Sequence, residues 1–431
     1  MPSIAIRRGL WAVGLVCTAG CGGESMGAAG TTTQRVTLEM DTASASMSEP
    51  MQGIAALHEE MYPVAVKVVR FQSQDTMDTS IMSRFAAGDP PQAFEAGPGE
   101  NAIQFANGGL DLSGADWVSS FSPTVLQPLT QNGKLIGVPF GVVRQNVAYW
   151  NLRVLSTLAP PLNAVPTGVD GFKTWLVGLS AAGYTHPLCF GLNDGWVAAH
   201  ILFEDIVPAM AGGAFSTLYW SGKDPNGASS ASMSAALDFA AQYVLPYLTS
   251  DSATMGMADG IDRVMKSEAD KTQQCIMTAM GDWGGTQLVS APDSYVAGPG
   301  NDFDASGWPG AEDLAVFADN DAMIAAVGNQ SASDVLALFE TLASVRGQLL
   351  FATKTGEMPA RFLTPADQAT LPYLVQVDVS ALSKSGVPGF KVTANSKYDF
   401  DTLYTVAQNF FLSGDKTPVL AFLAQSYASL Q

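Results

Sequence analysis

The stretch from Gln274 to Gly285 places a large aromatic residue beside a carboxylate and among glycines. Residues 275–277 form a short apolar run of strand length, and the glycine-rich segment after it can turn sharply. We expect Trp283, beside Asp282, to project from the end of this strand. Such a ring can cover the apolar face of a sugar while polar groups bind its hydroxyls. A core tryptophan next to a surface turn is the alternative.

Catalytic and metal-binding signatures are missing from the chain. It contains no G-x-S-x-G elbow, no H-E-x-x-H motif and no glycine loop before a phosphate-binding lysine. His58, His186 and His200 show no metal-ligand spacing, and His200 is expected to pack near Trp196. Residues 302–313 resemble half of a calcium loop, but a proline interrupts them and the final glutamate is missing. We therefore expect an acidic surface loop there, and no enzyme, metal or cofactor.

The length and composition of the chain favour a two-domain globular protein. It has 431 residues, more than one ordinary hydrophobic core accommodates. Hydrophobic residues make up 47% of the chain and charged residues only 14%. The net charge of −19 repels phosphate backbones and anionic lipid surfaces, so we expect no nucleic-acid partner. This net charge does not argue against a neutral ligand.

The N-terminus has the layout of a secretory signal. Two arginines precede an apolar run from Gly9 to Val16, and residues 18–21 are TAGC. This ending resembles the bacterial lipoprotein signal, in which the cysteine, here Cys21, is lipidated. We therefore assign 1–21 to a lipoprotein signal peptide and 22–34, which are small and polar, to a flexible tether. An ordinary cleaved signal is the alternative.

Two cysteines remain beyond the signal, Cys189 and Cys275, and both lie in apolar runs of strand length. An exported compartment permits a disulfide. The two cysteines are therefore either bonded to each other or buried as small apolar side chains. No later apolar run approaches the roughly 20 residues that a membrane span requires.

The elements after the tether predict a parallel α/β sheet. Val36–Met40 and Val64–Val69 have the composition of strands, and Met51–Met61 between them has helical spacing. A strand, a helix and a strand in this order are typical of a βαβ unit. The next elements are expected to be a helix over 80–87 that stops at Gly88 and a strand over 93–96 that carries Glu95 to its end.

The rest of the chain predicts further alternation of helices and strands. Residues 133–151 include a longer strand that could cross between two lobes, and 297–312 form a loop rich in glycine, aspartate and proline. The other expected elements are helices at 168–183, 196–203, 230–249, 331–342 and 401–412, and strands at 187–190 and 275–277.

Seven stretches, taken together and in order, resemble one family. They are 86–96, 132–151, 193–205, 280–285, 317–323, 354–362 and 409–415. The chain resembles the extracellular solute-binding proteins (family 1, maltose-binding-protein-like) of carbohydrate ABC transporters, and is most similar to the glucose/mannose-binding branch.

The resemblance implies an α/β, two-lobed periplasmic-binding-protein fold (type II). Each lobe would be a mostly parallel sheet flanked by helices, and about three crossover segments would join the lobes. On this basis 35–147 plus 318–362 form the N-terminal lobe, and 148–317 plus 363–431 form the C-terminal lobe.

The resemblance also implies a set of ligand-binding residues. Trp283 matches the family's stacking tryptophan, Asp319 its hydroxyl-binding carboxylate, and Trp196 a tryptophan that opens a helix beside the cleft. The other matched positions are Glu95, Arg144 and Lys354. Arg144 could instead pair with a carboxylate between the lobes, Asp319 could cap a helix or turn, and Trp196 could be a core residue.

The chain departs from the family after its first strand. The family has two adjacent tryptophans there, whereas residues 40–44 are MDTAS and contain no aromatic. A lysine near Thr124 and a histidine near Pro388 are also missing. These departures weaken the ligand prediction more than the fold prediction, because each lost ring or charged hydrogen bond costs roughly 1–3 kcal/mol.

These observations predict a substrate-binding lipoprotein of a carbohydrate ABC importer, exported to the cell envelope and monomeric. It would capture a sugar by lobe closure and deliver it to a membrane permease. Two alternatives stay open. The same fold could serve as a surface glycan sensor or structural lipoprotein that has lost the sugar, or Glu95 and Asp319 could form the carboxylate pair of a sugar-cleaving enzyme.

Overall fold

A βαβ unit opens the described part of the computed structural model, which comprises residues 36–430 except for 44, 97–104, 106, 228–229, 291–293, 320–321, 327, 329 and 391–398. Strands β1 (Thr37–Thr42) and β2 (Ala65–Arg70) pair in parallel, and α1 (Ala45–Met61) connects them. The predicted βαβ unit is thereby confirmed. The predicted signal peptide 1–21, its Cys21 and the tether 22–34 lie outside the described residues.

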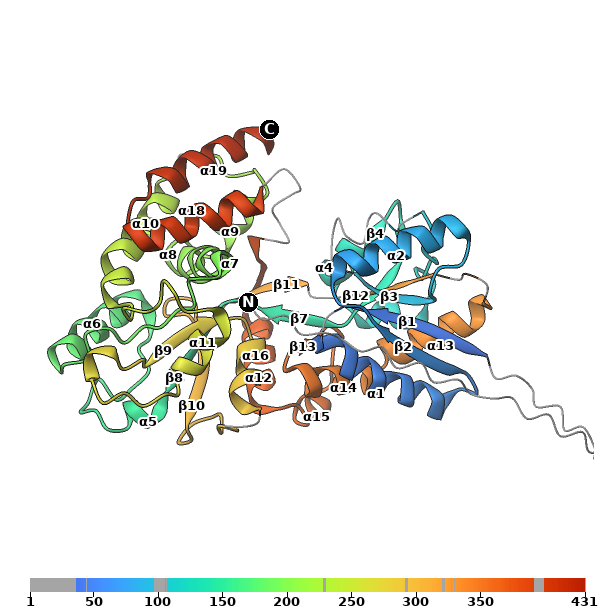
Figure 1. Ribbon diagram of the computed structural model, residues 1–431, viewed down its shortest axis with the longest axis horizontal. Helices are drawn as coiled ribbons and strands as arrows, with labels where there is room; N and C mark the ends of the chain where they lie inside the picture. Colours follow the sequence, from blue (N-terminus) through green and yellow to red (C-terminus); the bar gives the residue numbers. More distant parts are fainter. Residues whose placement is uncertain are drawn as a thin grey trace, which may run out of the picture. The chain divides into compact units, whose positions relative to one another are not determined.

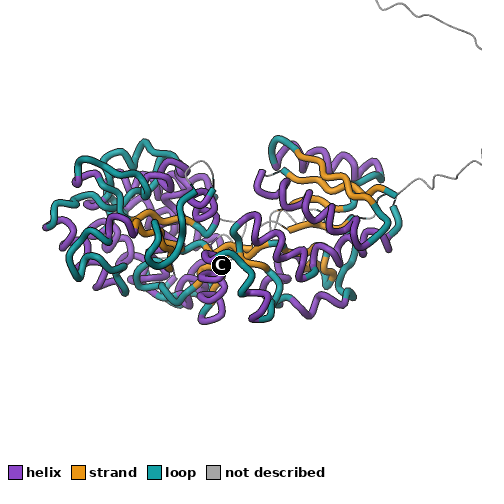
Figure 2. Tube along the Cα trace, turned by 90° about the horizontal axis from the view of Figure 1, so that it is seen from below, coloured by secondary structure: helices purple, strands orange, loops and turns teal. Residues whose placement is uncertain are grey.

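The five-stranded sheet built on this unit is mixed, with the order β2-β1-β3-β12-β6. β3 (Ala93–Ala96) is parallel to β1, whereas β12 (Ala322–Ala325) is antiparallel to both β3 and β6 (Gly137–Pro139). Before β3, α2 (Gln74–Ala87) ends as predicted at Gly88, whose φ of 74° is one that glycine adopts readily. Helices flank this sheet on both faces (Figures 1 and 2).

One hydrophobic core forms around this sheet, from residues within 38–142 and 317–360. The helices α13 (Ala332–Ala343) and α14 (Val345–Thr355) contact α1 and contribute to it. The apolar side chains predicted for the first of these helices are all fully buried, namely Val335, Leu338, Phe339 and Leu342.

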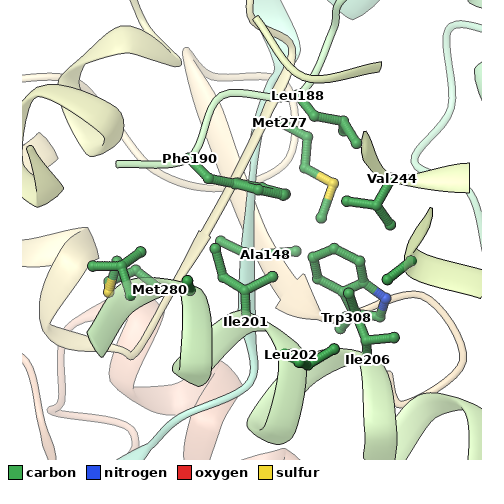
Figure 3. Close-up of a cluster of buried hydrophobic side chains, with 14 of the residues drawn as sticks. Ala148, Leu188, Phe190, Ile201, Leu202, Ile206, Val244, Met277, Met280 and Trp308 are labelled. Atoms are coloured by element: carbon green, nitrogen blue, oxygen red, sulfur yellow. The ribbon is translucent and has the colours of Figure 1, made fainter. Parts of the chain in front are cut away.

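A second hydrophobic core surrounds a three-stranded antiparallel sheet. β8 (Val147–Asn151) is its central strand, between β10 (Phe303–Gly307) and β9 (Met277–Met280). Its apolar side chains come from residues within 147–308 and 390–427. Figure 3 shows the fully buried Trp308 among Ala148, Ile206 and Val244.

The helices of this second core include one irregular turn. α7 (Gly195–His200) continues into the π-helical turn Ile201–Ile206 and then into α8 (Val207–Ala211). The longer helices around this core include α6 (Gly168–Ala181), α9 (Gly213–Trp220), α10 (Ala231–Tyr243), α18 (Phe400–Ser413) and α19 (Thr417–Leu430).

A third sheet contains strands on the segments that pass between the two cores. Its order is β13-β7-β11-β14, formed by β13 (Met358–Pro359), β7 (Gly141–Arg144), β11 (Ala315–Asp319) and β14 (Gly386–Pro388). The chain therefore passes between the cores near residues 143–147, 308–317 and 360–390.

The predicted long strand within 133–151 is in fact broken into β7 and β8 at Gln145 and Asn146. The side chain of Asn146 explains the break, because it takes the place of a strand neighbour. Its Oδ1 accepts the backbone N–H of Val316 at 2.8 Å, and its Nδ2 donates to the carbonyl of Leu314 at 2.8 Å.

Three other expectations about strands need correction. The sheets are mixed or antiparallel rather than mostly parallel, since the strands of the second core run in opposite directions. The predicted strand at 187–190 makes only isolated bridges, through Leu188. The predicted loop at 297–312 contains β10, which pairs with a strand remote in sequence.

Short segments complete the described chain. The helices among them are α4 (Pro123–Leu126), α5 (Leu152–Leu155), α11 (Met257–Arg263), α12 (Trp283–Val289), α15 (Pro365–Gln368) and α16 (Tyr373–Lys384). A hairpin joins β4 (Thr130–Gln131) to β5 (Lys134–Leu135). The 3-10 turns are Asp116–Ser120, Gln127–Leu129, Leu245–Tyr247 and Lys271–Gln273.

Cys189 and Cys275 form a disulfide, with Cα atoms 5.6 Å apart, which decides between the two alternatives left open for these cysteines.

Among the described helices, none alone is long and apolar enough to cross a membrane. α13 and α14 meet that criterion only when taken together, and they are bent by 57° at their junction.

Candidate functional site

Three rings gather where two helices begin. Trp283 is the first residue of α12 and Trp196 the second of α7, and both indoles are half-buried. Their ring centroids lie 6.3 Å apart, and the imidazole of His200 lies 5.8 Å from the indole of Trp283 and 6.2 Å from that of Trp196. The predicted proximity of His200 and Trp196 is confirmed.

The glycines around Trp283 allow its indole to fold back onto the chain. A methyl group at Gly281 would collide with the Trp283 ring, so only glycine fits beneath it. A methyl group at Gly285 would approach Leu374 to 2.5 Å. The expected sharp turn is therefore present: β9 ends at Met280, and Trp283 begins α12 three residues later.

Asp282 ties the start of α12 to the end of β7. Its Oδ2 accepts the backbone N–H of Arg144 at 3.0 Å, and its own N–H donates to the Arg144 carbonyl at 2.9 Å. Tyr149 holds the same turn, because its hydroxyl shares its one proton between the carbonyls of Gly281 and Asp282 and accepts the N–H of Gly285 at 2.8 Å. The first turn of α12 is thus fixed from both sides.

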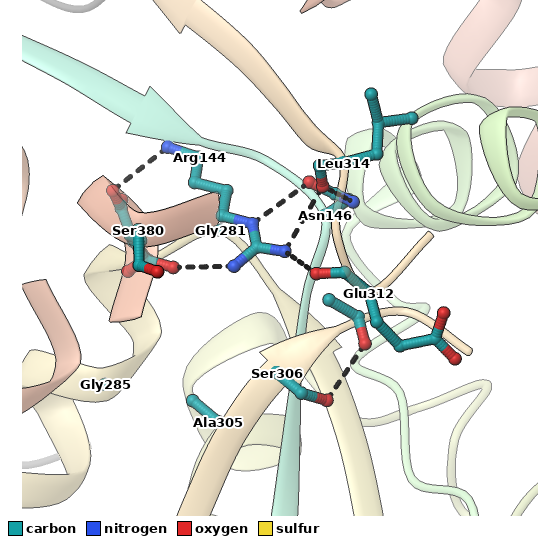
Figure 4. Close-up of polar contacts among 12 residues, drawn as sticks. Arg144, Asn146, Gly281, Gly285, Ala305, Ser306, Glu312, Leu314 and Ser380 are labelled. Atoms are coloured by element: carbon teal, nitrogen blue, oxygen red, sulfur yellow. Dashed lines mark hydrogen bonds and ion pairs between the residues drawn. The ribbon is translucent and has the colours of Figure 1, made fainter. Parts of the chain in front are cut away.

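Arg144 is buried, with 1% of its surface exposed, and its guanidinium group binds other parts of the chain. It pairs with Asp378 of α16 at 3.1 Å and donates to the carbonyls of Glu312 and Leu314 at 3.3 and 3.2 Å. Figure 4 shows this group beside Asn146, Glu312 and Leu314. This geometry favours the alternative that Arg144 pairs with a carboxylate between segments over direct ligand contact.

Several buried carboxyls lie around Arg144. Burial raises the pKa of Asp378 to about 6, and the Arg144 guanidinium limits the rise. Burial also raises the pKa of Asp282 well above its usual range, with further contributions from Asp378 and Glu357. Burial likewise raises the pKa of Asp205, a fully buried residue of the π-helical turn. Burial therefore makes each of these acids harder to ionise than it is in water, and the Arg144 guanidinium opposes this effect at Asp378.

A second group of polar side chains lies at the carboxyl ends of β1 and β3. These strands are parallel neighbours, so Thr42 and Glu95 meet at one sheet edge. Glu95 is 2% exposed, and its Oε2 accepts the backbone N–H of Ala43 at 2.8 Å. Thr42 is fully buried, and its hydroxyl has no hydrogen-bond partner among the described residues.

Asp41 lies beside Thr42, in the segment where the resembled family has tryptophans. It is fully buried, and the guanidinium of Arg84, which also pairs with Glu39, lies 3.6 Å from its carboxylate. Burial raises the pKa of Asp41 to about 7, and the nearby Glu39 raises it while Arg84 lowers it. This segment is therefore acidic and buried from water.

The remaining predicted site residues lie apart from the ring cluster in the sequence. Lys354, near the end of α14, forms an ion pair with Glu49 of α1 at 2.7 Å, and both side chains are largely exposed. Asp319 is the last residue of β11 and is followed within three residues by β12, which adjoins β3. The side chain of Asp319 lies outside the described part of the structure.

The roles of three residues are not evident from the sequence, namely those of Tyr149, Asp282 and Asp378. Asp282 could have been found from its place between Gly281 and Trp283, whereas Asp378 has no local signal, because its partner is far away in the sequence. Among the described residues, no group of three or more histidine, cysteine or acidic side chains is arranged to hold a metal ion. The arrangement suits binding through aromatic faces and polar groups.

Comparison with known proteins shows what the chain is similar to. No protein-family model matches it. The xylose/arabinose-binding protein XacG of Haloferax volcanii is 22% identical over 293 residues, which are 66% of this chain and 60% of that protein. The match thus spans less than two thirds of this curated relative.

Solved structures match over nearly the whole chain. RafE from Streptococcus pneumoniae covers 92% of this chain and 98% of its own length with a TM-score of 0.71 at 18% identity. RafE in complex with raffinose gives a TM-score of 0.69 at 19% identity and covers 92% and 99% of the two chains. A probable secreted solute-binding lipoprotein from Streptomyces coelicolor gives 0.70 at 16% identity, covering 92% and 99%.

The chain therefore has the two-lobed solute-binding-protein fold, and the predicted α/β fold class is confirmed. Its predicted resemblance to the solute-binding proteins of carbohydrate ABC transporters is confirmed as well.

Proposed function

We propose that this chain is the extracytoplasmic substrate-binding lipoprotein of a carbohydrate ABC importer. It captures a sugar between two lobes by hinge closure and presents it to a membrane permease. The observation that carries this proposal is the pair of half-buried indoles, Trp196 and Trp283, with the imidazole of His200 against both. Aromatic faces are suited to the C–H face of a sugar ring.

The names of the similar proteins support a carbohydrate as the ligand. XacG is a xylose/arabinose-binding protein, and other proteins with this fold are named as binding chitin oligosaccharides, raffinose or maltose. We propose Trp283 and Trp196 as ring contacts. Glu95, Asp319 and Lys354 are proposed as hydroxyl contacts, and Arg144 as a residue that acts through the hinge segments.

The proposed lobes keep the predicted bounds, 35–147 plus 318–362 and 148–317 plus 363–431. The two hydrophobic cores draw on residues in similar ranges, which supports this division. We further propose that the protein is exported, anchored through a lipid on Cys21 and monomeric. A disulfide between Cys189 and Cys275 supports export, because such bonds persist in oxidising compartments.

Calorimetry against neutral sugars tests the proposed ligand class. The panel contains xylose, arabinose, galactose, raffinose, maltose, and chitin and xylan oligosaccharides. At least one sugar is expected to release or absorb heat, and Trp283→Ala should weaken its binding about tenfold, since a stacked ring contributes roughly 1–1.5 kcal/mol. The control is Trp117→Phe in the other hydrophobic core, which should leave the affinity unchanged. Absence of heat with every sugar would contradict the proposal.

A surface glycan-sensing or structural lipoprotein is the second candidate. The observation in its favour is the acidic, ring-free segment at Asp41 and Thr42, which removes two stacking surfaces that the resembled family uses. The genes beside this one would distinguish an importer component from a glycan-sensing or structural lipoprotein. Permease genes beside this one favour import, and an isolated gene favours sensing.

A further inference from the structure

The segment between β9 and α12 is held to the first passage between the cores by a reciprocal pair of hydrogen bonds. Asp282 accepts the N–H of Arg144 with its side chain and donates its own N–H to the Arg144 carbonyl. We propose that Asp282 is a positioning residue for sugar binding, which fixes the start of α12 and thus the Trp283 indole to β7. This inference rests on the proposed function.

A change at Asp282 acts directly on Trp283 because the two residues are neighbours in the chain. Trp283 follows Asp282 in the chain, and its indole lies over Gly281 on the other side of Asp282. The fully buried hydroxyl of Tyr149 holds Gly281 on one side of Asp282 and Gly285 on the other. If the Asp282 carboxylate were removed, the Arg144 N–H would lose its acceptor in a buried site, which costs free energy. The turn would then relax, and the indole would move with it.

The same bonds extend to the other passages between the cores. The backbone of Arg144 holds Asp282, while its guanidinium holds Asp378 of α16 and the carbonyls of Glu312 and Leu314, just before β11. All three passages therefore meet at Arg144, the third of them through α16. A ligand that moves the Trp283 ring would move the segments on which the lobes turn, and the reverse holds as well.

The charges around Asp282 decide which substitution preserves its role. The groups that face it are Arg144 of β7, Tyr149 of β8, Glu357 before β13 and Asp378 of α16. Burial and the two neighbouring acids raise the pKa of Asp282 well above its usual range, so the neutral acid is favoured. Asparagine has nearly the same shape, is neutral and keeps an oxygen that can accept the Arg144 N–H. Asp282→Asn is therefore the conservative variant, and Asp282→Ala removes the acceptor.

Fluorine NMR of the protein labelled with 5-fluorotryptophan tests this positioning role without needing a sugar. The resonance of Trp283 is assigned with Trp283→Phe, and that of Trp117, in the other core, with Trp117→Phe. Asp282→Ala is expected to shift or broaden the Trp283 resonance and to leave that of Trp117 in place. Asp282→Asn should restore the wild-type Trp283 resonance. The matched control is Asp302→Ala, whose carboxylate also accepts a backbone N–H, that of Val296.

The same variants are then measured by calorimetry with the sugar that binds best. Asp282→Ala should weaken binding about tenfold, Asp282→Asn should stay within threefold of the wild type, and Asp302→Ala should have no effect. If Asp282→Ala does not fold, Tyr149→Phe is measured instead, because it removes the hydroxyl that holds the same turn; the Trp283 resonance should again shift.

Three outcomes would overturn the inference. They are an unchanged Trp283 resonance in Asp282→Ala, an equal change of the Trp117 resonance, and an Asp282→Asn variant that behaves like Asp282→Ala. Failure of every sugar to bind the wild type would contradict the proposed function instead, and the resonances would still decide whether Asp282 positions Trp283.

Discussion

Trp283 owes its orientation to neighbours that have little or no side chain. Its indole lies on Gly281, and the next residue, Gly284, lies against the Tyr149 ring, where a methyl group would be 3.1 Å away. Small residues here let a large ring and a buried tyrosine approach the backbone closely. The sequence GDWGG is therefore explained by packing around one tryptophan.

Gly281→Ala is expected to displace the Trp283 indole, because the added methyl group would occupy the place of the ring. Overpacking of this kind typically costs about 1–3 kcal/mol of stability. Chemical denaturation measures the stability, and calorimetry with the bound sugar should show a weaker affinity. Gly114→Ala is the control, since nothing lies within 4 Å of a methyl group there. Equal behaviour of the two variants would contradict the packing that we describe.

Local patterns in the sequence predicted part of this site and missed the rest. The spacing of Trp196 and His200 on one helix predicted their proximity, and the glycines around Trp283 predicted the turn before it. Only the structure shows that the Trp283 ring joins the other two. The pairing of Arg144 with Asp378 could not be predicted, because the partners lie on different elements and nothing near either residue specifies the other. The predicted ligand roles of Glu95, Lys354 and Asp319 remain predictions.

At the scale of elements, helices were easier to predict than strands. α2 and α18 end at Gly88 and Gly414, both with left-handed φ, so the local sequence is enough to predict where these helices end. β10 was missed, because a strand needs a partner and its partner β8 lies far away in the sequence. The break at Asn146 was missed because it depends on hydrogen bonds to Leu314 and Val316.

The disulfide joins two segments of the second core that are 86 residues apart in the sequence. Cross-linking a loop of this length restricts the unfolded chain and typically stabilises a protein by roughly 2–5 kcal/mol. Replacing both cysteines, Cys189→Ala and Cys275→Ala, is expected to lower the free energy of unfolding by about this amount. Thermal and urea unfolding with and without reductant provide the measurement.

The double cysteine variant also supplies its own control, since reductant should destabilise the wild type and have no effect on the variant. A wild type that is equally stable in oxidising and reducing conditions would contradict a stabilising bond between these cysteines.

At the scale of the whole molecule, buried acids outnumber the cations near them. Asp41 has Arg84 for a partner and shares it with Glu39, while Asp378, Asp282 and Asp205 lie around Arg144. The fold therefore favours protonation of some of these groups. The net charge of −19 indicated an acidic molecule, but only the structure shows that part of this acidity is inside it.

This burial predicts how stability changes with pH. The pKa of Asp41 rises from 3.8 in the unfolded chain to about 7 in the folded protein. Between these values the folded protein holds a proton that the unfolded chain has released. The contribution of Asp41 to stability is therefore fully present below pH 3.8 and is lost as the pH rises through about 7. Asp378, with a pKa of about 6, acts in the same direction.

Asp41→Asn is expected to reduce the loss of stability between pH 5 and pH 8 by an amount on the order of 2 kcal/mol, because asparagine does not ionise. Urea unfolding at the two pH values measures this difference. The control is Asp170→Asn, whose side chain is 96% exposed and should leave the pH dependence as it is. An identical pH dependence in the wild type and Asp41→Asn would exclude Asp41 as its source.

The π-helical turn Ile201–Ile206 sets the rotational phase between the two halves of one continuous helix. Since each residue of an α-helix advances by roughly 100°, deleting one residue from this turn would rotate α7 by about that angle relative to α8. Trp196 would then swing away from Trp283, and His200 would lose the carbonyl of Gln145, which lies 2.8 Å from its Nε2. The aromatic cluster thus depends on the wider turn that follows His200 in the chain.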